Sequence, residues 1–386
     1  MKNLKKVLKK NKFILLVYEF FFQRPVLNVF GRRNSKSILF AYSTYHFKSS
    51  DYSAHSNYQE SIVIARVFDA MGYNVDVVNN NKETSLDFSK YSMVFGEGLP
   101  VYQAIISGYK DKVVYYATGS HPWHCSNGSL GRLIDFVRRY NRVPINSLRL
   151  QDYRWGVAAS CAARVICIGN QQTKQTFTTT GVINIDLINP TFHQGEQSYR
   201  RDLKNIATSR KTALWFGSYG LLHKGLDLAV EALRRRPDWT LHVCGYTDAE
   251  SYMIEAMDVP QNVHIHSFLD VNSSFFADLS SSCLYVLLPS CSEGIATSVI
   301  TAMGRGGMIP VVTQEAGVDL GDYGVEINGL ASDDICRALE QCDTLEDKQL
   351  LEMGQKAYLY ANQNYSLDAF KARMERLLRK SLEVVE

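Results

Sequence analysis

Short apolar runs alternate with helical stretches along this chain, and this alternation constrains the fold more than any other feature of the sequence. Between the first two runs, Tyr58–Met71 places apolar residues near a helical period, and Gly72 follows as a helix-ending glycine. Runs of this length suit strands that are buried on both faces. Strands alternating with helices predict a parallel, doubly wound α/β sheet. The first series of predicted strands lies at 36–42, 73–79, 91–98, 112–120, 163–170 and 183–189.

A second series of the same kind follows a polar stretch at about 192–210, so we expect two Rossmann-like halves in tandem. Its predicted strands lie at 213–218, 240–245, 263–268, 283–290 and 308–313. Further helices are predicted at Leu130–Asn141, Gly225–Arg235 and Ser292–Gly304, and a last one from Ser366 through Lys380. The expected division is a basic segment at 1–36, domains at 37–195 and 211–365 joined by a linker at 196–210, and a C-terminal helix at 366–386.

The eight cysteines do not predict a metal site. None forms a C-x-x-C pair, and no histidine cluster accompanies them at zinc spacing. Several lie inside apolar runs, such as Cys167 and Cys244. We interpret them as small buried side chains in a reducing compartment, and we expect a cytoplasmic protein without a metal cofactor.

The charge of the chain is concentrated at its N-terminus. Residues 1–36 carry ten Lys or Arg and one Glu, a net +9, whereas the whole chain carries +3 and the remainder therefore −6. A mildly acidic body argues against nucleic acid as the partner. The apolar run Phe13–Phe22 is about half the roughly twenty residues that a membrane-spanning helix needs.

Three interpretations of residues 1–35 compete. A helix on an anionic membrane surface accounts for both the lysines and the apolar run, and it is our preferred interpretation. A solvated helix that caps the fold is the next alternative. A secretory signal is the third, although no small-residue cleavage site follows the apolar run. The preferred interpretation predicts a protein peripheral to the inner face of the plasma membrane.

Two loops that follow predicted strands of the second half carry candidate binding residues. In GSYGLLHKG, Gly217 and Gly220 allow close approach of a ligand, and Lys224 precedes a helix whose N-terminus favours phosphate. In PSCSEGIA, Glu293 can accept hydrogen bonds from sugar hydroxyls, while amides near the predicted helix start can hold a phosphate. An ordinary glycine turn and a carboxylate that only complements the helix dipole are the plainer alternatives.

The second loop also carries a family resemblance. Its residues resemble the P-S-x-x-E-G signature of retaining GT-B glycosyltransferases of the family 4 type, the glycosyl transferases group 1. The matching residues are Pro289, Ser290, Glu293, Gly294, Ala302, Met303, Gly307, Pro310, Val311 and Val312. The resemblance covers roughly 210–330. It implies two domains facing a cleft and a C-terminal helix that crosses back to the first domain.

The resemblance also implies residue roles. Glu293 would contact the donor sugar and Lys224 the diphosphate, without a metal, because lysine and the helix terminus supply the positive charge. Two positions depart from the pattern, since Thr301 stands where a second Glu would bind ribose and Ser218 where an Arg is frequent. The expected donor-binding residues are Gly217, Ser218, Gly220, Lys224, Gly245, Ser292, Glu293, Gly294, Ile295, Ala296 and Thr301.

Candidates in the first half are less specific. His121, in the loop predicted after the fourth strand, resembles a family histidine near the reacting sugar, and the alternative is a loop histidine without a role. His55, Glu97 and His124 are candidates for contact with the acceptor.

The sequence and its resemblance together predict a retaining glycosyltransferase that moves a sugar from a nucleoside diphosphate sugar to a glycan. The resemblance and the basic segment suggest a lipid-linked acceptor in bacterial surface-polysaccharide assembly. A nucleotide-sugar epimerase on the same fold, or an inactive sugar-nucleotide-binding paralogue, is the alternative.

Overall fold

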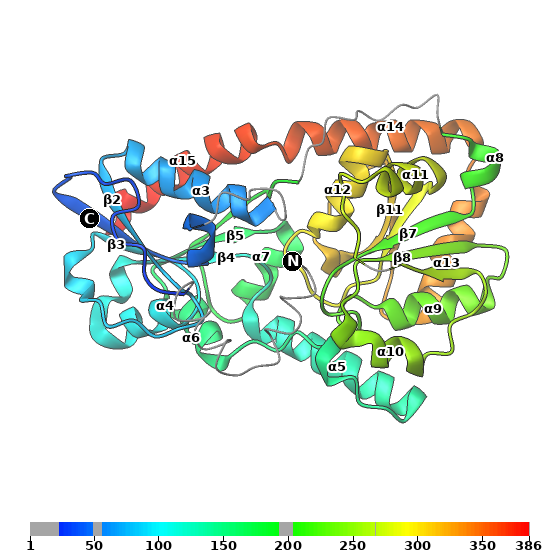
Figure 1. Cartoon of the computed structure of the whole chain (residues 1–386), viewed down its shortest axis with the longest axis horizontal. Helices are drawn as coiled ribbons and strands as arrows, with labels where there is room; N and C mark the ends of the chain where they lie inside the picture. The colour runs from blue at the N-terminus through cyan, green and yellow to red at the C-terminus, as the bar shows by residue number, and fades with distance from the viewer. Residues whose placement is uncertain (1–22, 49–55, 193–203, 267, 386) are drawn as a thin grey trace.

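The computed structural model describes residues 23–48, 56–192, 204–266 and 268–385. The predicted membrane-surface helix falls mainly on residues 1–22, which lie outside these ranges, as do His55 and most of the predicted linker. Within the described residues, two separate parallel sheets of six strands each lie side by side, flanked by helices (Figure 1). The predicted class, α/β with two Rossmann-like units, is confirmed.

The first sheet has the order β2-β1-β3-β4-β5-β6. Its strands are almost entirely apolar and buried, because helices cover both faces. The strands are β1 (Lys36–Ala41), β2 (Tyr73–Val78), β3 (Met93–Gly96), β4 (Val113–Ala117), β5 (Arg164–Ile168) and β6 (Ile185–Ile188). Its helices are α3 (Ser56–Ala70), α4 (Leu99–Ala104), α5 (Pro122–Tyr140), α6 (Tyr153–Cys161) and α7 (Gln171–Thr178).

The second sheet has the order β12-β11-β10-β7-β8-β9. Its strands are β7 (Thr212–Phe216), β8 (Thr240–Cys244), β9 (Val263–Ile265), β10 (Tyr285–Leu288), β11 (Ile309–Thr313) and β12 (Val325–Ile327). Its helices are α8 (Ile206–Ser209), α9 (Leu226–Arg235), α10 (Ser251–Ala256), α11 (Ser274–Ser282), α12 (Thr297–Gly306), α13 (Ser332–Thr344) and α14 (Asp347–Asn364).

The last helix, α15 (Leu367–Val385), crosses from the second half to the first (Figure 1). Whereas α14 packs on α12 and β11, α15 packs on α3 and β6. Ser366 Oγ accepts the Ala369 N–H at 3.2 Å and caps α15, and Arg373 Nε donates to the Leu187 carbonyl at 2.7 Å. The predicted crossing of the C-terminal helix is confirmed.

Two predicted helix starts need correction. Helix α5 begins at Pro122 rather than Leu130, because His121 caps it and proline is favourable in a first helical turn. Helix α12 begins at Thr297 rather than Ser292, because 289–296 runs as an irregular loop against 315–317. Strand β12 and helices α13 and α14 were not among the predicted elements.

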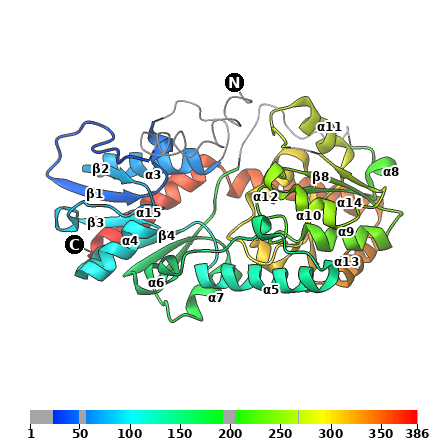
Figure 2. The same cartoon turned by 60° about the horizontal axis from the view of Figure 1, so that its bottom comes forward.

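Helix α5 reaches from the first half beneath the second (Figure 2). Arg132 and Arg139 of α5 both form ion pairs with Asp227 in the first turn of α9. Asp227 and Arg132 are buried, so the two halves share a desolvated charge cluster. This contact joins α5 of the first half to α9 of the second.

Candidate active site

The site begins where the strand order of the second sheet reverses. Strands β7 and β10 are hydrogen-bonded neighbours although about seventy residues separate them, and their following loops leave on opposite sides. Such a reversal opens a crevice at the carboxyl ends of the strands. A cavity of about 520 Å³ lies there, lined by the second half and by first-half residues that include Tyr42, Glu60 and Thr118.

Lys224 reaches this cavity from the loop after β7. The next residue, Gly225, has a φ of 69°, and a side chain there would clash with the Pro289 carbonyl. Only glycine therefore allows the two loops to approach this closely. Lys224 Nζ forms an ion pair with the Glu293 carboxylate, and both side chains are largely buried.

Glu293 has three polar partners. Besides Lys224, Ser290 Oγ donates to Glu293 Oε1 at 3.2 Å and Arg149 Nη1 to Oε2 at 3.2 Å. Burial alone would raise the pKa of Glu293, but the charges of Lys224 and Arg149 outweigh it and hold the pKa well below its ordinary value. The carboxylate is therefore ionised at neutral pH, beside two cations.

Arg149 was not among the residues predicted from the sequence. It belongs to the first half, yet its guanidinium donates to the Tyr219 carbonyl of the second at 3.0 and 3.2 Å. It lies about 75 residues before Lys224, in a segment without a recognisable motif. Only the packing of the two halves brings it to Glu293.

A buried histidine holds Arg149 in place. His223 Nε2 lies against the Ser292 carbonyl and must donate to it, which leaves Nδ1 to accept from Ser129 Oγ at 2.7 Å. The Arg149 N–H donates to the same Ser129 hydroxyl at 3.1 Å. Burial lowers the pKa of His223 to about 4, so the neutral ring that this chain requires is the stable form.

The loop before α12 uses some of its amides internally. The Glu293 N–H donates to the Glu315 carbonyl at 2.8 Å and the Ala296 N–H to that of Ala316 at 2.9 Å. The predicted availability of the Ala296 amide for a phosphate is therefore incorrect. The amides of Gly294 and Ile295 make no backbone hydrogen bond within the described ranges, and both residues line the cavity.

The two departures from the family pattern both face the cavity. Thr301 lines it, but its hydroxyl donates to the Thr297 carbonyl at 2.7 Å within α12. Ser218 also lines it, together with Gly217 and Gly245. Gly220 is not at the wall, because its N–H donates to Glu250 Oε1 at 2.9 Å and it packs on Arg149.

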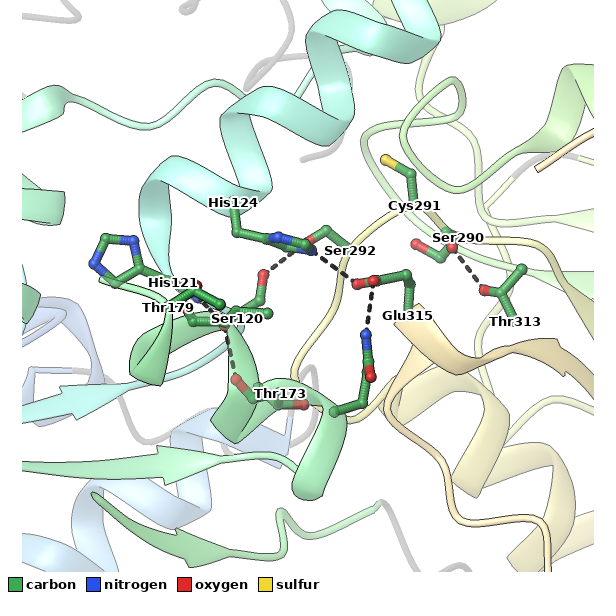
Figure 3. A network of polar contacts seen from close by, with 12 residues as sticks. Ser120, His121, His124, Thr173, Thr179, Ser290, Cys291, Ser292, Thr313 and Glu315 are labelled. Atoms are coloured by element: carbon green, nitrogen blue, oxygen red, sulfur yellow. Dashed lines mark hydrogen bonds and ion pairs between the residues drawn. The ribbon is translucent and has the colours of Figure 1, made fainter. Parts of the chain in front are cut away.

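His121 does not line the cavity. Its ring caps α5 by accepting the Trp123 N–H at 3.3 Å, and Nε2 lies 3.1 Å from Ser160 Oγ. Figure 3 shows the ring turned away from the contacts between the halves. Burial lowers its pKa to about 4. This geometry corrects the predicted catalytic role, because the ring is neutral, buried and committed to a helix cap.

His124 and Ser292 join the two halves. His124 Nε2 contacts Glu315 Oε2 at 3.0 Å, and Gln172 Nε2 donates to the other carboxylate oxygen at 3.0 Å (Figure 3). The Ser292 hydroxyl contacts that of Ser120. These residues hold the halves together beside Glu293, which differs from the predicted acceptor contact of His124.

Glu97 lies in a smaller cavity of about 130 Å³ that adjoins the first one at Thr118, Arg149, Glu293 and Gly294. Asn80 Nδ2 donates to its Oε1 and Thr118 Oγ1 to its Oε2, both at 3.1 Å. Burial raises the pKa of Glu97 to about 7. Across the described chain, no group of three His, Cys, Asp or Glu side chains could hold a metal ion.

Comparison with protein families identifies the segment that carries this site. Residues 200–319 match the family model of the glycosyl transferases group 1. This segment therefore carries a glycosyl transferases group 1 domain. The matched segment includes Lys224, Glu293 and Thr301, and the domain supports activity with a nucleoside diphosphate sugar as donor. No curated protein sequence matches the chain.

Solved structures agree on the fold. Sucrose-phosphate synthase from Thermosynechococcus elongatus has a TM-score of 0.60 and 13% identity, with 89% of this chain and 98% of that chain covered. HepE from Anabaena in complex with UDP-glucose has a TM-score of 0.55 and 15% identity, covering 89% and 99%. WaaG, a glycosyltransferase involved in lipopolysaccharide biosynthesis, has a TM-score of 0.54 and 14% identity, covering 90% and 99%. The chain thus has the GT-B fold.

Proposed function

We propose that this chain is a retaining, metal-independent glycosyltransferase that transfers a sugar from a nucleoside diphosphate sugar to a lipid-linked glycan in bacterial surface-polysaccharide assembly. The observation that carries the proposal is the cluster of Lys224, Arg149 and Glu293 at the wall of the larger cavity. Two cations face one carboxylate there, so the cluster has a net positive charge.

The excess charge suits a diphosphate. Lys224 and Arg149 would bind the phosphate oxygens, and the free amides of Gly294 and Ile295 would add donors at the same wall. These groups would stabilise the negative charge that develops on the leaving diphosphate, which is the part that a metal ion has in other transferases. Glu293 would orient the sugar by accepting hydrogen bonds from its hydroxyls.

The smaller cavity is the proposed acceptor side. It adjoins the donor cavity at Glu293 and Gly294, and Glu97 offers it a carboxylate that is shared with Asn80 and Thr118. Retention requires the acceptor oxygen to approach the same face of the sugar that the diphosphate leaves. A phosphate oxygen of the departing donor would then accept the proton of the acceptor hydroxyl, so that no separate base is needed on that face.

The lipid-linked acceptor has two sources of support. The basic segment at 1–36 favours an anionic membrane surface. WaaG, whose fold this chain shares, is involved in lipopolysaccharide biosynthesis. UDP-glucose is the ligand of the similar HepE structure, which makes uridine diphosphate sugars the first donors to examine.

The test is a donor panel with direct product detection. The full chain is incubated with nucleoside diphosphate sugars, with and without membrane extracts as acceptor, and nucleotide release, sugar transfer and epimer formation are followed separately. Transfer with an unchanged anomeric configuration in excess chelator is the expected result. Epimer formation without nucleotide release would support the epimerase alternative, and donor binding without turnover would support the inactive one.

A further inference from the structure

The exposed side of α5 carries apolar side chains at helical spacing. Trp123, Leu130 and Ile134 follow one another at intervals of seven and four residues, which places them on one side of the helix. Trp123 is 44% exposed and Ile134 is 51% exposed. A helix that only covers a core presents polar side chains to water. The exposed side of α5 departs from that pattern.

The apolar surface continues onto the start of α6. Trp123 Nε1 donates to the Tyr153 carbonyl at 3.3 Å, so the two aromatic residues are neighbours, and Tyr153 is 66% exposed. Among the described residues, six of the seventeen exposed large apolar side chains lie between positions 123 and 153. Four of the six, Trp123, Leu130, Ile134 and Tyr153, are joined by the helical spacing of α5 and by the contact between Trp123 and Tyr153.

Positive charge accompanies this surface at the end of α5 and in the residues that follow the helix. The arginines on the inner side, Arg132 and Arg139, are paired with Asp227. Arg138 and Arg142 are exposed, and neither makes an ion pair within the ranges that the structure describes. We call Trp123, Leu130, Ile134, Tyr153, Arg138 and Arg142 the α5 face.

The α5 face lies next to the smaller cavity. Pro122 and Cys125 at the start of α5 line the smaller cavity, as does Gln151 just before Tyr153. Helix α5 runs along one edge of the molecule in both views, with no described helix or strand drawn beyond it on that edge (Figures 1 and 2). A bilayer against this edge would hold the lipid end of an acceptor close to the opening beside Glu97.

We propose that the α5 face docks on an anionic membrane surface, with Trp123, Leu130 and Ile134 entering the headgroup boundary and Arg138 and Arg142 contacting lipid phosphates. Exposed tryptophan and tyrosine, aliphatic side chains and unpaired arginines form the combination that such surfaces bind. Docking is independent of residues 1–36. Its purpose, delivery of a lipid-linked acceptor, rests on the proposed function.

The test measures vesicle binding of the full chain without donor or acceptor. Phosphatidylglycerol–phosphatidylcholine vesicles are compared with pure phosphatidylcholine, for the wild type, Leu130→Glu with Ile134→Glu, and the control Ile183→Glu, an apolar residue that is 84% exposed elsewhere. We expect the double variant to lower binding to the anionic vesicles about tenfold, which is ~1.4 kcal/mol. The control should lose far less for each negative charge that it adds, since the double variant adds two such charges and the control adds one.

A second measurement locates the contact. Lipids brominated on the acyl chain should quench the tryptophan fluorescence of the wild type but not that of Trp123→Phe. The remaining described tryptophans, Trp155, Trp215 and Trp239, are at least partly buried and should be quenched little. Equal binding by the double variant and the control, or no quenching of Trp123, would overturn the proposal. A dimer in solution that the double variant abolishes would also overturn it, in favour of a second copy on this face.

The proposed reaction is scored separately by donor hydrolysis in detergent-free buffer. The Leu130 and Ile134 side chains line neither cavity, so the double variant should hydrolyse the donor at the wild-type rate. If the wild type does not hydrolyse any donor, the proposed function is contradicted. If the wild type does not prefer anionic to neutral vesicles, only the docking of the α5 face is contradicted.

Discussion

Arg149 of the first half donates to the Glu293 carboxylate of the second half at 3.2 Å. This contact crosses the boundary between the two sheets and lies at the wall of both cavities. The proposed donor site is therefore complete only when the halves are closed on each other. The Arg149 side chain thus contributes both to the contact between the two halves and to the positive charge beside Glu293.

Lys224→Ala should lower turnover strongly. The variant removes the cation that contacts Glu293 and leaves Arg149 as the remaining one, and loss of one such preorganised group costs about 10²- to 10³-fold in rate. Nucleotide release under saturating donor measures the effect, and the circular dichroism spectrum checks the fold. The control Lys356→Ala removes a surface ion pair with Asp322 and should be neutral. Transfer by Lys224→Ala at the wild-type rate would remove this residue from the mechanism.

Arg149→Ala should weaken donor binding, because the proposed diphosphate loses a forked donor. A charge-assisted hydrogen bond contributes about 1.5–3 kcal/mol, so the donor KM should rise about ten- to a hundredfold. Arg149→Lys keeps the charge without the fork and should give an intermediate KM. If both variants bind a nucleoside diphosphate as tightly as the wild type in calorimetry, Arg149 serves closure alone.

Thr301→Glu should tighten donor binding if the ribose lies beside α12. The Thr301 hydroxyl is occupied by the Thr297 carbonyl, whereas a glutamate at this cavity wall could accept from two ribose hydroxyls. We expect the donor Kd to fall about tenfold, which corresponds to ~1.4 kcal/mol. Thr301→Val, which removes only the hydroxyl, is the matched control and should change Kd little. Weaker binding by Thr301→Glu would place the ribose elsewhere.

Glu97→Gln should change the dependence of stability on pH. Burial raises the pKa of Glu97 to about 7 from an ordinary value near 4.5, so the folded state holds a proton that the unfolded chain releases. Stability contributed by this group is present below about pH 4.5 and is lost as the pH rises through 7. Glutamine does not ionise, so the Tm of the variant relative to wild type should be higher at pH 8 than at pH 5.

Glu60 titrates in the same range, since burial also raises its pKa to about 7. The Glu97→Gln variant should therefore keep part of the wild-type dependence of Tm on pH. A Tm difference that is equal at pH 5 and pH 8 would show that Glu97 does not titrate between them. In transfer assays, Glu97→Gln should raise the acceptor KM while donor hydrolysis stays unchanged, because Glu97 lies in the smaller cavity only.

Asp227→Asn should destabilise the whole molecule. The substitution leaves the buried Arg132 with only the exposed carboxylate of Asp135, at 3.5 Å, and breaking a buried pair costs about 3–5 kcal/mol. Urea unfolding measures the change. The control, Asp333→Asn, breaks an exposed pair with Arg235 and should change the free energy of unfolding by less than about 1 kcal/mol. Equal effects of the two substitutions would mean that the buried cluster does not join the halves.

Much of the fold could be predicted because its signals are local. The apolar runs at 36–42 and 283–290 became central strands, since a buried parallel strand needs no partner-specific pattern. The helix starts were less accurate. Helix α5 starts at Pro122, because capping by His121 extends it by about two turns before its periodic part. Helix α12 starts only at Thr297, because the loop before it makes hydrogen bonds with 315–317.

Lys224 and Glu293 could be predicted because each follows a strand of the same sheet, and parallel strands bring their carboxyl ends to one edge. His121 could not be placed in the same way. Its neighbours Ser120 and Pro122 line the smaller cavity, and a single helix cap turned the ring inward. Sequence spacing does not record which way a side chain points at a helix start.

The sequence by itself determined two α/β halves, a glycine-lined loop with Lys224, and a carboxylate at Glu293 in the segment that matches the glycosyl transferases group 1. Only the tertiary structure decided that Arg149 completes the cluster, that Asp227 anchors α5, and that α5 turns an apolar face outward. The physical reason is the sequence separation over which each kind of interaction acts. Periodicity and turn chemistry act over a few residues, whereas these contacts join residues 88 to 144 positions apart and depend on how two separately wound sheets pack.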